Sequence, residues 1–202
     1  LASLPPAFSS PTILVNNVGG GRPGGILSAS ESDWRQALEV NLSSAFNCMR
    51  AIVPVMKARG GGSIVNIGSL HGIRYPGADM IGYCVAKAGL AQLSRCTAIE
   101  LAPFNIRSNT LLVGAVDTPE FRRRFAERYG ASNVNKVMEM RGSSIPLGKC
   151  ASVWDVANAT VFLASNEAAH ITGSDLSVDG GAAAVTVPSY VQEAARLFAA
   201  DR

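Results

Sequence analysis

Apolar runs of strand length alternate along this chain with longer stretches in which apolar residues recur at helical spacing. The sequence predicts strands at residues 12–16, 63–67, 106–113 and 175–178. The first is a continuous apolar run, as in strands buried on both faces. Helices are predicted from Ser30 to about Lys57, from Met80 to Leu101, over 152–164, and as one or two helices joined at Gly130 within 118–146. This alternation predicts βα units in a parallel α/β sheet with helices on both faces.

Several of the predicted helix boundaries have local sequence signals. Ser30 fits an N-cap with Asp33 at the third helical position, Gly60-Gly61-Gly62 ends the first long helix, and Pro103 ends the second. Residues 19–24 satisfy the dinucleotide pattern G-x-G-x-x-G. However, the stretch contains a proline and the next helix starts only near Ser30, so we expect a loop here and not a pyrophosphate-binding turn.

Composition narrows the class of protein. The chain has 202 residues, of which 48% are apolar and 16% charged, and its net charge is +3. These values predict one globular domain over 1–202, with 182–202 as a C-terminal extension. The basic run 122–124 is followed at once by Glu127, which predicts a solvated helix face and no nucleic-acid partner.

The apolar runs are too short to span a bilayer, so no membrane association is expected. The four cysteines, Cys48, Cys84, Cys96 and Cys150, have no Cys-x-x-Cys spacing and no accompanying histidine pair. We therefore expect no metal site, and the cysteines are interpreted as buried free thiols of a cytoplasmic protein.

Candidate chemistry centres on Tyr83 and Lys87. Residues four apart share a helix face, so the phenol and the ammonium can point into one site. A nearby cation lowers the pKa of a tyrosine, and such a tyrosine can act as a general acid/base. Ser69 follows the predicted strand 63–67 at the edge where parallel sheets bind ligands. His71, two residues after Ser69, is a further candidate substrate contact.

The motifs around these residues closely resemble those of the short-chain dehydrogenase/reductase family. The matching segments are Gly62-Ser63-Ile64-Val65-Asn66-Ile67-Gly68-Ser69, Tyr83-x-x-x-Lys87, Leu14-Val15-Asn16-Asn17-Val18-Gly19, Val40-Asn41-Leu42, Ile106-Arg107-Ser108-Asn109, Val113-Gly114-Ala115-Val116-Asp117-Thr118, and the stretches 171–173 and 178–181. They follow the family order over residues 12–181. Within the family, the chain is similar to 3-oxoacyl-[acyl-carrier-protein] reductase-like members.

The resemblance implies hydride transfer between NAD or NADP and a small carbonyl or secondary alcohol substrate. It makes Tyr83 the general acid/base, Lys87 the residue that lowers its pKa and holds the nicotinamide ribose, and Ser69 the group that polarises the carbonyl. Asn41 would orient the lysine through a water. The substrate would contact Ser69, His71 and Tyr83. Tyr83 and Lys87 would also contact the cofactor, together with Asn17, Val18, Gly19, Val40, Val113, Gly114, Val116 and Thr118.

Three departures from the family pattern stand out. Val113 replaces a proline, and Val18 replaces an alanine. The third is larger: a doubly wound, Rossmann-like fold should open with a strand and a glycine-rich turn into a helix, and none precedes Ile13. We expect the chain to lack its first three βα units, about 80 to 90 residues, and the strand 12–16 to form an edge with an uncovered apolar face.

Alternatives remain open at this point. The chain could be a non-catalytic fragment that keeps only its assembly surfaces. In this family the first long helix and the Met80–Leu101 helix pair subunits, and the resemblance implies a homodimer or homotetramer. It could also belong to a member that dehydrates or epimerises. The resemblance assigns substrate choice to a loop over 71–79 and a lid over 119–146. A helix predicted over 189–200 would pack on a neighbouring subunit, over the substrate cleft or on its own domain.

Overall fold

The protein contains a parallel sheet of four strands. A computed structural model describes residues 10–75, 77 and 79–185, so the helix predicted over 189–200 lies outside the described residues. The strands are β1 (Ile13–Asn16), β2 (Gly62–Ile67), β3 (Ile106–Val113) and β4 (Asp175–Val178), and they lie side by side in that order. These bounds agree with the predicted strands to within one residue.

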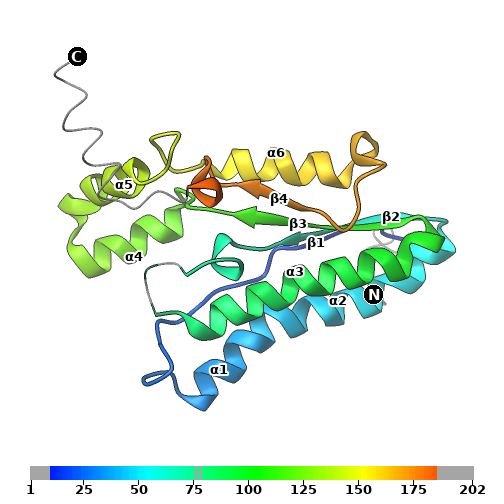
Figure 1. Ribbon diagram of the computed structural model, residues 1–202, viewed down its shortest axis with the longest axis horizontal. Coiled ribbons are helices and arrows are strands. Elements are labelled where there is room, and N and C mark those ends of the chain that lie inside the picture. Colours follow the sequence, from blue (N-terminus) through cyan, green and yellow to red (C-terminus); the bar gives the residue numbers. More distant parts are fainter. Residues whose placement is uncertain (1–9, 76, 78, 186–202) are drawn as a thin grey trace.

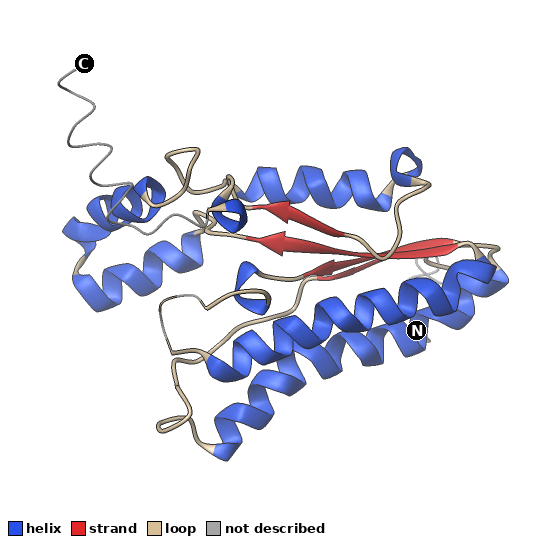
Figure 2. Cartoon of the chain, in the orientation of Figure 1, coloured by secondary structure: helices blue, strands red, loops and turns tan. Residues whose placement is uncertain are grey.

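Helices cover both faces of this sheet, as predicted (Figures 1 and 2). One face carries α1 (Glu31–Leu38), α2 (Ser44–Ala58) and α3 (Ile81–Leu101), and the other carries α6 (Val153–Ala164). Two shorter helices, α4 (Pro119–Tyr129) and α5 (Val134–Ser143), lie beyond the carboxyl ends of the strands. Short 3-10 turns occur at Leu70–Gly72, Ala102–Phe104, Ala131–Asn133, Asn166–Ala168 and Ala182–Ala184.

The core has one layer on each side of the sheet because successive strand residues point to opposite faces. On β2, Ile64 packs with Met49, Met56, Leu101 and Ile106 under α2 and α3. The next residue, Val65, packs with Leu111, Leu163 and Ala168 under α6. Most residues of β2 and β3 are therefore buried, whichever face they point to.

The outer position of β1 leaves apolar side chains exposed among the described residues. Ile13 is 51% exposed and Val15 is 41% exposed, whereas Leu14 packs against the core layer under α2. The expected edge strand with an uncovered apolar face is confirmed for this part of the chain. The expectation that three βα units normally precede it stays a prediction.

The first long helix is interrupted, and here the prediction of one continuous helix is wrong. A five-residue π-helical turn, Glu39–Ser43, separates α1 from α2. Within it, Asn41 Nδ2 donates to the carbonyl oxygen of Ala37 at 2.9 Å. That oxygen is the one a regular α-helix would use for the backbone N–H of residue 41. Turns of this kind occur frequently at functional sites.

The predicted starts of α1 and α6, the end of α3 and the joint between α4 and α5 are confirmed. Ser30 caps α1 by accepting a hydrogen bond from the Asp33 N–H, and Ser152 caps α6 in a reciprocal capping box with Asp155. After Pro103, Asn105 adopts a left-handed conformation that ends the helical path. The joint at Gly130 has φ +87°, which separates α4 from α5.

The cysteines are free, but the prediction that they are buried is wrong. Cys48 and Cys96 are exposed, and Cys84 and Cys150 are half-buried. Cys48 lies on α2 and Cys96 lies on α3. Over residues 10–75, 77 and 79–185, no helix combines the length and apolar character needed to cross a bilayer.

Candidate functional site

The carboxyl ends of β1 and β2 meet the amino-terminal half of α3, and the predicted catalytic residues gather there. Ser69 follows β2 and is buried, Tyr83 and Lys87 lie on the first two turns of α3, and Asn41 lies on the π-helical turn. Ser69 caps the turn Leu70–Gly72 by accepting a hydrogen bond from the His71 N–H at 3.2 Å. The strand end and the helix face therefore bring together residues that are distant in the sequence.

Lys87 is a buried cation. Its side chain is 4% exposed, and Nζ donates to the carbonyl oxygen of Ile67 at 2.7 Å. Burial lowers the pKa of Lys87 to about 8, because removal from water disfavours the charged form. An ammonium has three hydrogens to donate, so Nζ can bind further acceptors while it keeps its contact with the strand end.

The glycine-rich loop after β1 passes very close to these groups. A Cβ placed on Gly19 would lie 2.9 Å from Asn41 Oδ1 and 3.1 Å from Lys87 Nζ, and one on Gly21 would lie 2.9 Å from Tyr83 Cβ. A larger residue at either position would collide with these side chains. Glycine is thus needed for close approach, and the structure brings Gly19, Asn41 and Lys87 together as the sequence motifs suggested.

Asn41 joins this loop to the interrupted helix. Its Nδ2 donates to the carbonyl oxygen of Gly20 at 2.7 Å, and its Oδ1 accepts from the Gly20 N–H at 3.0 Å. The side chain is almost completely buried. Asn41 therefore positions the loop directly. The water-mediated role toward Lys87 that the family resemblance implies stays a prediction.

The expected lowering of the Tyr83 pKa is not what the structure gives. Burial raises the pKa of Tyr83 above its ordinary value, because the phenolate loses hydration, while the neighbouring Ser69 hydroxyl lowers it to a smaller extent. Lys87 Nζ lies 5.7 Å from the centre of the Tyr83 ring. The i, i+4 spacing predicted the proximity correctly, but desolvation has the larger effect on the phenol.

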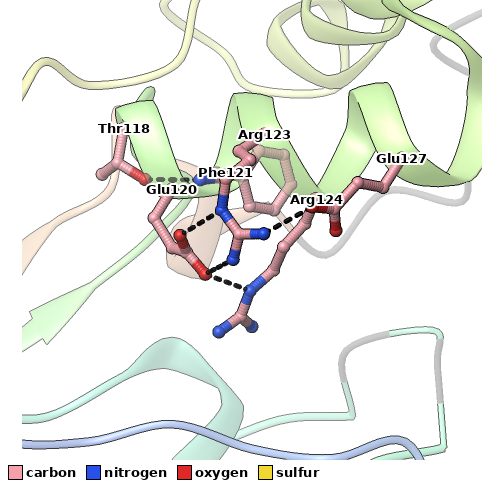
Figure 3. Close-up of polar contacts among 6 residues, drawn as sticks. All are labelled: Thr118, Glu120, Phe121, Arg123, Arg124 and Glu127. Carbon is pink, nitrogen blue, oxygen red and sulfur yellow. Dashed lines mark hydrogen bonds and ion pairs between the residues drawn. The ribbon is translucent and has the colours of Figure 1, made fainter.

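The other predicted cofactor residues lie just after β1, in the π-helical turn, and in the segment from the end of β3 to the start of α4. Val113 ends β3, a Cβ on Gly114 would lie 2.8 Å from Asp179 Cβ, and Val116 forms an isolated bridge with Ala151. Thr118 caps α4 by accepting a hydrogen bond from the Phe121 N–H at 3.1 Å (Figure 3). Closer to β1, Asn17 and Val18 are exposed and Val40 is half-buried. Whether these residues bind a cofactor stays a prediction.

The basic run on α4 is internally paired, as predicted for a solvated helix face (Figure 3). Glu120 accepts hydrogen bonds from Arg123 and Arg124, and Arg123 also pairs with Glu127. The hydrogen bonds from Arg123 and then Arg124 lower the pKa of Glu120 to about 2. These charges neutralise one another at the surface.

Arg141 on α5 is a candidate that the sequence analysis missed. Its guanidinium carbon lies 3.7 Å from the centre of the Phe121 ring, and its Nη1 is buried without a hydrogen-bond partner among the described residues. His71 Nδ1 is buried and unpartnered in the same way, and its ring contacts Tyr83 edge-on with the centres 5.8 Å apart. The only signal in the sequence was the place of Arg141 within the expected lid, which does not distinguish it from other arginines there.

Most of the chain matches known proteins in sequence and fold. Residues 4–183 match a family model described as Enoyl-(Acyl carrier protein) reductase. A 2,5-dichloro-2,5-cyclohexadiene-1,4-diol dehydrogenase of Sphingobium indicum is 36% identical over 181 residues, which are 90% of this chain and 68% of the relative. A 2,3-dihydro-2,3-dihydroxybenzoate dehydrogenase of Bacillus subtilis is 39% identical over 171 residues, 84% of this chain and 65% of the relative.

The expected likeness to 3-oxoacyl-[acyl-carrier-protein] reductases is also found. One from Thermotoga maritima is 36% identical over 84% of this chain and 65% of its own length. Among solved structures, a putative short-chain dehydrogenase/reductase from Burkholderia xenovorans superposes with a TM-score of 0.81 at 42% identity, covering 87% of this chain and 66% of that one. The chain thus spans about two thirds of the length of these relatives. It belongs to the short-chain dehydrogenase/reductase family.

Proposed function

We propose that this chain carries the catalytic residues of a nicotinamide-dependent oxidoreductase that interconverts a carbonyl and a secondary alcohol. The observation that carries the proposal is the convergence of Ser69, Tyr83 and Lys87 at the carboxyl end of β2, with Asn41 holding the glycine-rich loop against them. Ligands of open parallel sheets bind at this edge. The dehydrogenases and reductases among its relatives support the same reaction class.

In this proposal each residue has a separate role. Ser69 donates a hydrogen bond to the substrate oxygen, and Tyr83 gives that oxygen a proton in reduction or removes one in oxidation. His71, which contacts the Tyr83 ring, borders the substrate. Lys87 keeps a positive charge beside the reacting oxygen, where it favours negative charge that develops during the reaction.

The chain's own groups fit NAD or NADP, although the preference between them is not decided. Lys87 Nζ holds the Ile67 carbonyl and has two more hydrogens for ribose hydroxyls. The backbone of Gly19 lies within reach of the same ammonium because no side chain intervenes. When bound, the nicotinamide supplies or accepts the hydride. The remaining candidate contacts are Asn17, Val18, Val40, Val113, Gly114, Val116 and Thr118.

The proposal keeps three expectations from the sequence. Three further βα units would hold the pyrophosphate in the natural full-length protein, and that protein would work as a homodimer or homotetramer in the cytoplasm. The loop at residues 19–25 does not lead directly into a helix, since α1 starts at Glu31, which is consistent with a separate pyrophosphate site. We do not favour the non-catalytic alternative, because an assembly role gives no reason for a buried, largely cationic Lys87 beside Tyr83.

The decisive experiment replaces the phenol in the natural full-length protein. Tyr83→Phe should reduce kcat by about 100-fold or more, the scale of general acid/base catalysis, while the fold and cofactor affinity are retained. Tyr129→Phe is the matched control, because Tyr129 is largely exposed on α4, and it should stay within twofold of wild type. If Tyr83→Phe also stays within a few-fold of wild type with normal cofactor binding, Tyr83 does not have the proposed role.

A further inference from the structure

Two buried polar atoms, one of them on the histidine that contacts the Tyr83 ring, lack hydrogen-bond partners among the described residues. They are Nδ1 of His71 and Nη1 of Arg141. Buried polar atoms in folded proteins are nearly always paired, and an unpaired one costs about 1–3 kcal/mol, more when it is charged. Their occurrence together, next to a residue proposed to touch substrate, points to an external partner.

The position of Arg141 is fixed by its packing. Its guanidinium lies against the Phe121 ring at 3.7 Å. Stacking on an aromatic ring occupies one face of a guanidinium and leaves its N–H edge, a planar fork suited to carboxylates, free to form hydrogen bonds; in Arg141 the buried Nη1 of this edge has no partner among the described residues. Arg141 is also close enough to His71 for its charge to lower the histidine pKa, after the larger effect of burial. His71 therefore contacts the Tyr83 ring and also lies within range of the Arg141 charge.

The charge of Arg141 is not neutralised by its neighbours. Asp117 is close, but both of its carboxylate oxygens are held by Arg122, at 2.7 Å each. Cys150 is the other neighbouring acid, and burial raises the pKa of its thiol, which keeps it neutral near pH 7. Arg74 adds a second cation near His71, and its side chain donates to the carbonyl oxygen of Ala182. His71, which contacts the Tyr83 ring, thus lies within range of two positive charges.

We infer that the substrate carries a carboxylate and that Arg141 binds it, so that the alcohol or carbonyl carbon lies beside Tyr83 while the acid group lies against α5. The inference rests on the proposed function and adds a substrate class to it. It names Arg141 as a specificity-determining residue outside the Ser69, Tyr83 and Lys87 set. An alternative source of negative charge is a phosphate of the cofactor, and the experiment separates the two.

The relatives differ in whether the compound in their name carries a carboxylate. The name of the Bacillus subtilis dehydrogenase specifies a benzoate, which is a carboxylate, whereas that of the Sphingobium indicum enzyme specifies a neutral diol. Both kinds of compound therefore serve as probes. Because the reacting alcohol can be kept the same, a hydroxycyclohexanecarboxylate and its matching carboxamide differ only in the group that Arg141 would recognise.

The kinetic arm uses the natural full-length protein with saturating NAD or NADP. Wild type should oxidise the carboxylate with a kcat/KM at least tenfold above that for the carboxamide, and Arg141→Met should abolish this preference by raising KM for the carboxylate. Arg141→Lys keeps the charge but not the planar fork, so its preference for the carboxylate should lie between those of wild type and Arg141→Met. Arg128→Met is the matched control, because Arg128 also lies over an aromatic ring, that of Tyr129, but is exposed. This variant should change neither kcat/KM nor KM for the carboxylate.

A binding arm makes the result independent of turnover. Cyclohexanecarboxylate should raise the thermal midpoint of wild type more than cyclohexanecarboxamide does, and Arg141→Met should remove that difference. Equal effects of the two compounds on wild type would overturn the inference. So would an Arg141→Met variant whose main defect is a higher KM for the cofactor with the neutral carboxamide as substrate, since that assigns Arg141 to a cofactor phosphate. Absence of turnover with all probes, alongside carboxylate-selective binding, would count against the proposed function alone.

Discussion

Replacing Lys87 with methionine should stabilise the protein at neutral pH while it removes activity. The buried ammonium has a pKa of about 8, against 10.5 in the unfolded chain. Each unit of this difference corresponds to about 1.4 kcal/mol, so keeping the charge buried costs roughly 3 kcal/mol at pH 7. Methionine also loses the hydrogen bond to the Ile67 carbonyl, which is worth about 1 kcal/mol. The net gain expected for Lys87→Met at pH 7 is about 2 kcal/mol.

The pH dependence gives this prediction its sharpest test. The folded pKa of Lys87 is lowered, so the unfolded chain binds more protons between pH 8 and 10.5, and wild-type stability rises with pH across that window relative to the variant. The cost of the buried charge is complete below pH 8 and is relieved above it. The advantage of Lys87→Met should therefore shrink by up to roughly 3 kcal/mol as the pH approaches 10.5. All other titrating groups are common to both proteins, so they cancel in the comparison.

The assay is urea unfolding of the natural full-length protein without cofactor, at pH 7, 8, 9 and 10. Lys136→Met on the exposed side of α5 is the control, and its stability relative to wild type should not change with pH. A gap between wild type and Lys87→Met that stays constant from pH 7 to 10 would refute the reasoning, because it would mean that burial of the ammonium carries no electrostatic cost.

Two further predictions concern the same site. Asn41→Ala removes the hydrogen bonds that join Gly20 to the π-helical turn; urea unfolding should show a loss of about 2–3 kcal/mol, and the exposed Asn47→Ala control on α2 should show almost none. For carbonyl reduction, kcat/KM should fall as pH rises through about 8, where Lys87 loses its proton. In an active Lys87→Arg variant, the fall in kcat/KM should occur at a higher pH. If the fall stays at the same pH in that variant, the titration belongs to another group.

The parts of the fold that were predictable depend on local chemistry. β3 was predicted at its observed bounds, and it lies between Pro103 and Gly114. Ser30 was predicted as an N-cap, and its hydroxyl accepts a hydrogen bond from the N–H group three residues later. These signals act within a few residues, so one sequence is enough to read them.

The features that escaped prediction depend on contacts between distant segments. The π-helical turn forms around Asn41, whose side-chain amide makes two hydrogen bonds to the backbone of Gly20, and these hydrogen bonds were not predicted. The Tyr83 pKa is set by burial among surrounding elements, which outweighs the cation that the spacing suggested. Arg141 stands out because its buried Nη1 has no partner among the described residues and because Asp117 is already held by Arg122, and the sequence shows neither feature.

The opposite pKa shifts of Tyr83 and Lys87 bear on the direction of the proposed reaction. Burial raises the pKa of the phenol and lowers that of the ammonium, so both shifts favour uncharged forms. Near pH 7 the tyrosine therefore retains its proton while the lysine still carries most of its charge. A protonated phenol beside a cation can protonate an oxygen that gains negative charge, as in carbonyl reduction. Alcohol oxidation instead requires Tyr83 to accept a proton, and this demands either a higher pH or additional positive charge near the phenol.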